Sequence, residues 1–140
     1  MRRFGLIVAL LSLVLSVATA AGSVWYRAAA SEPHFTAEVC EGGVCEVLAD
    51  FGEVERSALS HRIIRLENST DEPLALLDYR ATCKCVWLTL PTKAIPAGGC
   101  ADVTITYDSR GEWGSVGNYI SIECSNESCK IAVWMAAEIQ

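Results

Sequence analysis

Alternation of apolar and polar residues is the dominant pattern between residues 46 and 139. It is clearest over residues 102–107, where Val103, Ile105 and Tyr107 are separated by single polar residues. Successive side chains of a β-strand point to opposite faces. This period of two therefore predicts a strand with one buried face and one solvated face.

Turn-forming residues divide this region into short segments. Asn68 to Pro73, Pro96 to Gly99 and Asp108 to Gly111 are rich in residues that favour turns. Between the turns, strands are expected at 46–51, 59–68, 74–83, 86–90, 102–107, 119–124 and 131–139. About seven short strands, with no helical period after residue 30, predict an all-β fold, namely an immunoglobulin-like antiparallel β-sandwich.

The N-terminal segment has the composition of an export signal. Two arginines precede an apolar run, Phe4 to Ala18, and the small residues 18–20 suit a signal peptidase. Alternatively, residues 4–26 carry no charge and are long enough to remain as a hydrophobic transmembrane helix, which needs roughly 20 residues. We therefore expect either a cleaved signal peptide, residues 1–20, or a membrane tether, residues 4–26. Both predict an extracytoplasmic protein of the periplasm or cell envelope.

Length and charge narrow the class of protein further. The 140 residues include 11 basic and 17 acidic ones, a net charge of −6. Residues 1–20 hold two arginines and no acid, so removing them leaves 9 basic and 17 acidic residues, a net charge of −8. An acidic chain without a cluster of lysine and arginine is not expected to bind nucleic acid. The remaining 120 residues suit one domain, residues 46–140, after a linker with a cysteine loop at 21–45.

Seven cysteines follow the export segment, as suits an oxidising compartment. Cys40 and Cys45 flank a glycine-containing tetrapeptide, and Cys124 and Cys129 flank a turn-like one. We expect each pair to close a local disulfide, which would stabilise the fold by roughly 2 kcal/mol. Because seven is odd, at least one thiol stays free or pairs between chains. The pairing of the other three cysteines is left open, and these are Cys83, Cys85 and Cys100.

An ordered series of short motifs suggests a family. The motifs are Phe51-Gly52, Leu66-Glu67-Asn68-Ser69, Glu72-Pro73-Leu74, Thr82-Cys83-Lys84-Cys85, Ile95-Pro96-Ala97-Gly98 and Tyr107-Asp108-Ser109-Arg110-Gly111. Over residues 46–139 this order resembles the bacterial domain-of-unknown-function family 1573. The resemblance implies an exported immunoglobulin-like sandwich, similar in shape to hydin-type and major-sperm-protein-like domains and found in bacteria such as Bacteroidetes. It implies no established activity. The chain departs from the family pattern at Lys84, where glycine is usual, and at Val86, where threonine is frequent.

The Cys83-Lys84-Cys85 segment is the main candidate for chemistry. Thiolates suit copper(I) or zinc, and a neighbouring lysine can lower the pKa of a thiol. A direct Cys83–Cys85 bond would close a small ring, and strained disulfides are readily reduced. We expect a structural role, in which one of the pair bonds to Cys100 or both are half-buried thiols. The alternative is a thiol-based metal-binding or redox site, with Cys100 as third sulfur.

Trp113 is the main candidate for partner binding. It lies in the turn Gly111-Glu112-Trp113-Gly114. One interpretation is that its indole is exposed and anchors a partner. The alternative is that the indole folds over the end of the sandwich as a hydrophobic lid. The sequence contains no nucleophile elbow, phosphate loop or HxxxH zinc motif. We therefore expect a non-catalytic structural or protein-interaction module without a cofactor, whose partner is an unknown protein or cell-envelope component.

Overall fold

The computed structural model describes residues 33–140 apart from residue 41. The expected signal peptide or anchor helix lies outside the described residues, and so does most of the expected linker. No helix of the described part is long and apolar enough to span a membrane. Residues Pro33–Gln140 form one compact unit. It begins earlier than the predicted domain, which was expected to start at residue 46.

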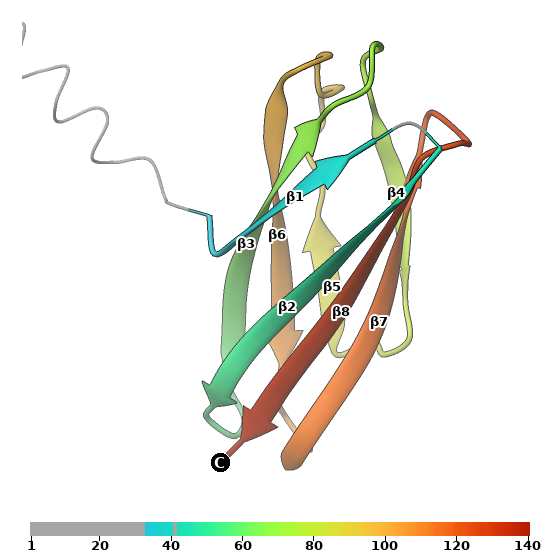
Figure 1. Ribbon diagram of the computed structural model, residues 1–140. Coiled ribbons are helices and arrows are strands. Elements are labelled where there is room, and N and C mark those ends of the chain that lie inside the picture. Colours follow the sequence, from blue (N-terminus) through green and yellow to red (C-terminus); the bar gives the residue numbers. More distant parts are fainter. Residues whose placement is uncertain (1–32, 41) are drawn as a thin grey trace, which may run out of the picture. The chain divides into compact units, whose positions relative to one another are not determined.

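Eight strands form a two-layer sandwich (Figure 1). In chain order they are β1 (Phe35–Val39), β2 (Val44–Val54), β3 (Leu59–Asn68), β4 (Leu76–Ala81), β5 (Val86–Thr89), β6 (Cys100–Asp108), β7 (Gly114–Cys124) and β8 (Lys130–Ile139). One sheet has the order β1-β3-β6-β5 and the other has the order β2-β8-β7-β4. The prediction of an all-β sandwich is confirmed.

The predicted alternation places the core between the sheets. Val103, Ile105 and Tyr107 are fully buried along β6, and Ile64 and Leu66 are buried along β3. The inward residues of β7 and β8 complete the core: Ile120, Ile122, Ile131, Val133 and Met135. Burial of these apolar side chains is the main stabilising term of the domain.

The strand pairing differs from the prediction in two respects. β1 was assigned to the linker, whereas the structure pairs it with β3, and this pairing is parallel. β2 also pairs in parallel, with β8, so the sandwich is not wholly antiparallel. β1 has only five residues and lies at a sheet edge, so its own pattern is weak. Its stability comes from β3, a partner about thirty residues away in the sequence.

The connections gather at two ends of the sandwich. The disulfide end, as we call it, contains the connections at residues 55–58, 82–85 and 109–113. The cysteine end contains the connections at residues 40–43 and 125–129. These two connections lie at the same end because β2 and β8 run parallel, with Val44 opposite Lys130 where both strands begin.

Candidate functional site

Cys83 and Cys85 form a disulfide in the β4–β5 connection, with an S–S distance of 2.01 Å. The alternative pairing with Cys100 is therefore wrong. Cys100 begins β6, whereas Cys85 lies beside Asp108 at the end of that strand. Eight residues of extended chain separate the two positions, which corresponds to about 26 Å. For the same reason Cys100 cannot act as a third sulfur for this pair.

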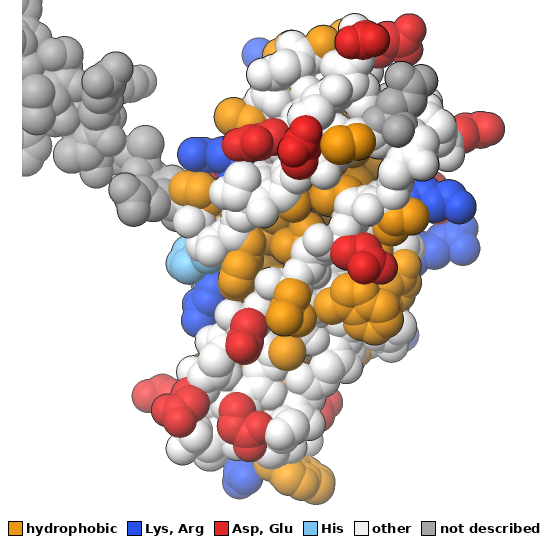
Figure 2. All heavy atoms as spheres, in the orientation of Figure 1, with side chains coloured by type: hydrophobic (Ala, Val, Ile, Leu, Met, Phe, Trp, Pro, Cys, Tyr) orange, Lys and Arg blue, Asp and Glu red, His pale blue; other side chains and the backbone are white. Residues whose placement is uncertain are grey.

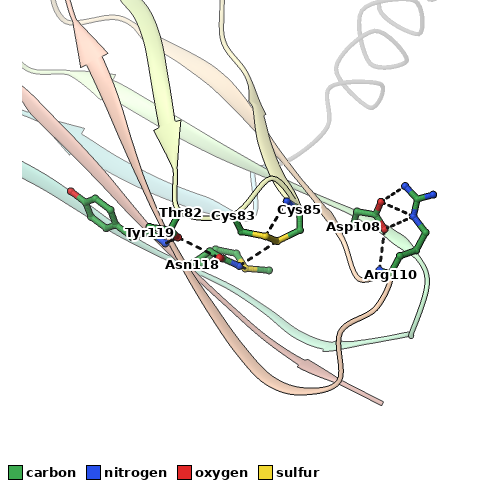
Figure 3. Close-up of a disulfide and its surroundings, with 8 residues drawn as sticks. Thr82, Cys83, Cys85, Asp108, Arg110, Asn118 and Tyr119 are labelled. Carbon is green, nitrogen blue, oxygen red and sulfur yellow. Dashed lines mark hydrogen bonds and ion pairs between the residues drawn. A yellow bond between two sulfur atoms is a disulfide. The ribbon is translucent and has the colours of Figure 1, made fainter.

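Backbone and side-chain contacts fix the disulfide to the neighbouring strands (Figure 3). The Asp108 N–H donates to the Cys85 carbonyl oxygen at 2.8 Å. Asn118 of β7 places its Nδ2 3.8 Å from the Cys85 sulfur and also 3.8 Å from the Met135 sulfur. Thr82, at the start of the connection, accepts the Tyr119 N–H through its hydroxyl at 3.0 Å. The disulfide is thus held by both sheets of the sandwich.

The β6–β7 connection is equally well fixed. Ser109 is completely buried, and its hydroxyl donates to the Glu55 carbonyl oxygen at 2.7 Å and accepts the Ala58 N–H at 2.9 Å. Asp108 forms an ion pair with Arg110, and hydrogen bonds from Arg110 lower the pKa of the Asp108 carboxyl. These contacts order the start of the β6–β7 connection, which also carries Glu112 and Trp113.

Glu112 brings a carboxylate to the disulfide. One of its oxygens and the sulfurs of Cys83 and Cys85 all lie within 4.8 Å of one another. Burial raises the pKa of the nearby Tyr107 hydroxyl, and the Glu112 charge adds to the increase. The Tyr107 hydroxyl has no hydrogen-bond partner among the described residues. A disulfide, a carboxylate and a buried phenol thus share one end of the sandwich, where the carboxylate can accept or donate a proton during thiol chemistry.

Trp113 points into solvent on the same loop. It is 72% exposed, more than any other large apolar residue described, so the alternative that it covers the end of the sandwich is wrong. The adjacent Gly114 has a φ of +70°, a conformation that glycine adopts without strain. The disulfide end thus presents an exposed indole beside the disulfide loop.

The family is identified by residues 44–139, which match the model described as "Protein of unknown function (DUF1573)". The chain belongs to the DUF1573 family. The matched segment contains seven of the eight strands and the whole disulfide end, whereas β1 and Cys40 precede it. The resemblance expected from the motifs is confirmed. No curated protein matches this DUF1573 chain.

Solved structures resemble the DUF1573 domain in fold. A protein of unknown function from Porphyromonas gingivalis W83 superposes with a TM-score of 0.57 at 19% identity, over 78% of this chain and 50% of that one. The PapD-like domain 7 of human CEP192, an ASH/PapD-like domain, gives 0.51 at 16% identity, over 79% and 89%. SSP-19, an MSP-domain-like protein of Caenorhabditis elegans, gives 0.47 at 11% identity, over 64% and 92%. The chain thus spans half the length of the Porphyromonas protein, and these likenesses concern the fold alone.

The four cysteines expected to close local disulfides are free thiols in the DUF1573 structure. Each of three sulfurs faces an oxygen instead of its partner across the loop. The Cys40 sulfur lies 3.7 Å from a Glu38 carboxylate oxygen, and the Cys129 sulfur lies 3.6 Å from the Cys40 carbonyl oxygen. The Cys124 sulfur lies 3.8 Å from the Ile122 carbonyl oxygen. Only Cys83 and Cys85 form a disulfide among the described residues.

These thiols nevertheless lie close enough to influence one another. Burial raises the pKa of Cys124 to about 11, and negative charge on Cys129 and Cys45 contributes to the rise. The pKa of Cys45 is raised by burial and then by Cys40. The thiols of Cys45 and Cys124 are therefore harder to ionise than an ordinary cysteine thiol, and they are unreactive compared with an activated thiolate.

A second exposed surface lies on the outer face of the β2-β8-β7-β4 sheet. Leu48 and Tyr119 flank Trp134 in strand register, and the two aromatic ring centroids are 4.7 Å apart. Figure 2 shows hydrophobic side chains in the middle of this face, with acidic side chains around them. Trp134 is 49% exposed, so Trp113 and Trp134 face solvent on different surfaces, and Trp87 on β5 is 37% exposed.

Proposed function

We propose that the chain is an exported, non-catalytic immunoglobulin-like module that binds a protein partner of the cell envelope through its disulfide end. The observation that carries this proposal is the 72% exposure of Trp113 on a loop that is held in place. A large indole costs free energy when it is left in water, and tryptophan is enriched among the residues that dominate binding interfaces.

The order of the loop supports the same proposal. Ser109 and Asp108 fix its first residues, and the Cys83–Cys85 loop is hydrogen-bonded to Asp108. An exposed anchor on a rigid loop loses little conformational entropy when a partner covers it.

Site-specific photo-crosslinking in intact cells tests the partner proposal. A photoreactive phenylalanine analogue replaces Trp113 in the full chain, and a matched variant carries it in place of Trp134. We expect a discrete crosslinked protein from position 113 and a weaker or different product from position 134. Crosslinks from position 134 alone would instead assign the interface to the outer face of the β2-β8-β7-β4 sheet. Crosslinks from neither position would contradict partner binding at both surfaces.

Export is proposed from the N-terminal composition. Two arginines, the apolar run Phe4 to Ala18 and the small residues 18–20 form the three regions of a signal peptide. Cell fractionation of the full chain, with mass measurement of the product, tests this. An extracytoplasmic protein that begins near residue 21 supports cleavage, whereas a full-length membrane-bound product supports the tether at residues 4–26. A cytoplasmic product would overturn export.

A thiol redox role is the second candidate, favoured by the carboxylate of Glu112 beside the Cys83–Cys85 disulfide. In this role a dithiol reductant transfers two electrons to the disulfide. The S–S bond breaks, two protons reach the sulfurs, and the reductant becomes a disulfide. Glu112 is the group placed to relay one of these protons.

Equilibration of the full chain with dithiol buffers of defined potential tests the redox role. A Glu112→Gln variant should change the pH dependence of the reduction rate, because the relay is lost. A Glu127→Gln variant at the cysteine end is the matched control. A Cys83–Cys85 bond that stays closed at the potential of glutathione buffers, or a rate that is unaffected by Glu112→Gln, would contradict the redox role.

A further inference from the structure

The outer face of the β2-β8-β7-β4 sheet carries rows of side chains that cross β2, β8 and β7. The aromatic row contains Leu48, Trp134 and Tyr119. Two further rows follow toward the disulfide end, and strand register gives their members: Asp50, Ala136 and Gly117, and then Glu53, Glu138 and Ser115. These two rows contain three acidic residues and no basic one. They place the three carboxylates on the same face as the aromatic pair.

A β-bulge in β2 turns two of these carboxylates to the same face. The register shifts between Asp50 and Glu53, and Gly52 within the shift has a φ of +66°. In a regular strand, positions 50 and 53 would point to opposite faces of the sheet. Because of the bulge, Phe51 and Val54 are buried while Asp50 and Glu53 are both exposed. The Gly52 N–H donates to the Asp50 carboxylate at 2.8 Å.

The acidic residues line a shallow groove of about 380 Å³ on this face. The sheet surface is low here, because Ala136 has only a methyl group and its neighbour Gly117 on β7 has no side chain. Asp50, Glu53 and Glu138 are all among the lining residues. Figure 2 shows acidic side chains on the lower part of this face, below the hydrophobic group. The groove is therefore an acid-lined extension of the aromatic row.

The negative charge of the groove is not paired within the described part of the chain. Three ion pairs occur among the described residues, and none of them includes a carboxylate of the groove. Arg62, which belongs to the other sheet, donates to the Phe51 carbonyl oxygen at 2.9 Å and lies over the Phe51 ring. Arg110 is paired with Asp108. A cationic group of a partner can therefore complement the groove.

The spacing of the carboxylates favours an organic cation over a metal ion. Among the described residues, only Cys83, Cys85 and Glu112 bring three candidate ligand atoms within 4.8 Å of one another. The carboxylates of the groove are thus too far apart to share a bare ion. A second copy of this chain is also disfavoured, because it would bring the same acidic groups together.

We propose that the groove binds an arginine side chain of an extended peptide segment from another protein, whose neighbouring apolar side chain packs on the aromatic row. A guanidinium group is a planar fork of donors that matches carboxylates, and it also stacks on aromatic rings. A cation close to the face of a tryptophan is further stabilised by the ring. The inference does not rest on the proposed function, because it uses neither Trp113 nor the disulfide.

Spacing along β8 defines the sequence expected in the ligand. Trp134 and Ala136 are two residues apart, which corresponds to about 6.7 Å along a strand. Alternate side chains of an extended peptide have the same spacing. A segment that lies along β8 therefore places an apolar side chain on Trp134 and an arginine, two positions away, over Ala136. The guanidinium group then lies among Asp50, Glu53 and Glu138.

Titration with a defined peptide tests the site. The probe is a heptapeptide of serine, leucine and arginine, with leucine and arginine two positions apart, and the control peptide has citrulline in place of arginine. Citrulline keeps the planar shape but removes the charge. Calorimetry on the protein as isolated from cells should show at least tenfold tighter binding of the arginine peptide. NMR should show a shift of the Trp134 indole N–H signal and no shift of the Trp113 signal.

Two double variants with the same change of charge locate the binding site. Glu53→Gln/Glu138→Gln removes two carboxylates of the groove and should weaken binding of the arginine peptide at least fivefold. Glu67→Gln/Glu127→Gln removes two exposed carboxylates outside the groove and should change the affinity less than twofold. Trp134→Ala should weaken binding at least threefold. Circular dichroism checks that each variant is folded.

Four outcomes would overturn the arginine site. The first is equal affinity for the arginine and citrulline peptides, or no binding of either. The second is an equal effect of the two double variants, which would indicate general attraction to an acidic protein. The third is a shift of the Trp113 indole signal alone. The fourth is a dimer that Trp134→Ala dissociates, since a second copy would then cover this face.

Discussion

The carbonyl oxygen of Cys85 accepts a hydrogen bond from the backbone N–H of Asp108 at 2.8 Å. This bond connects the disulfide loop to the first residue of the segment that carries Arg110, Glu112 and Trp113. Any displacement of one loop therefore acts on the other. These two loops of the disulfide end form one structural unit, although they are more than twenty residues apart in the sequence.

Asp108→Asn should destabilise the protein at neutral pH but not in acid. Arg110 lowers the pKa of Asp108 below its ordinary value of 3.8, so the ionised form favours the folded state. This stabilisation is fully present above the unfolded-state pKa and is lost as the pH falls through the folded-state pKa. Urea unfolding at a series of pH values should give a difference from the parent chain that is constant above about pH 5 and shrinks below about pH 4.

The matched control for this prediction is Asp71→Asn, a change of an exposed aspartate in the β3–β4 connection. As a change on the surface, it should alter the unfolding free energy at neutral pH by less than about 0.5 kcal/mol. A difference between Asp108→Asn and the parent chain that persists unchanged to pH 2 would mean that the asparagine acts through packing and not through charge.

Ser109→Ala should cost about 2 kcal/mol of unfolding free energy. The Ser109 hydroxyl is buried, and its removal leaves the Ala58 N–H and the Glu55 carbonyl without their partner. Chemical denaturation measures the loss. Ser121→Ala, on the outer face of β7, should change stability by less than about 0.5 kcal/mol. Equal effects of both changes would contradict the role assigned to Ser109.

Asn68→Ala should be among the most destabilising polar substitutions, at about 3 kcal/mol. Asn68 is 1% exposed, and its amide donates to the carbonyl oxygens of Glu72, Ile95 and Pro96. Its side-chain oxygen accepts from Thr70. Burying these groups without a partner is costly. Asn126→Ala is the matched control. The Asn126 side-chain oxygen accepts hydrogen bonds from the backbone N–H and the hydroxyl of Ser128 in an exposed turn. This substitution should cost less than about 1 kcal/mol of unfolding free energy.

Local patterns predicted most of the fold. The alternation of Val103, Ile105 and Tyr107 identified β6 and its buried face, because a half-buried strand must place every second side chain in the core. The turn at Pro96 to Gly99 and the one after Asp108 separated the strands at nearly the observed boundaries. These elements are specified by residues close in sequence, which is why the pattern reveals them.

Features that depend on distant partners were less predictable. β1 is a strand because β3 lies beside it. The parallel pairing of β2 with β8 joins the second strand to the last one, and no local pattern in either strand indicates its partner. The same holds at the two ends of the sandwich. Sequence spacing singled out Cys83, Cys85 and Trp113, but it could not place Glu112 beside the disulfide. It also predicted two local disulfides, whereas the four cysteines are free thiols in two connections at one end of the sandwich.

Tyr107→Phe should leave the stability unchanged or raise it by up to about 1 kcal/mol. The Tyr107 ring is fully buried and packs against Phe51 with ring centroids 6.0 Å apart, a contact that phenylalanine keeps. The hydroxyl is buried without a hydrogen-bond partner among the described residues, so its removal relieves a desolvation cost. Thermal and urea unfolding measure the change, with Tyr119→Phe as the control. A loss of more than about 1 kcal/mol would reveal a partner for the phenol, and Glu112, whose charge contributes to the raised pKa of Tyr107, is the nearest candidate.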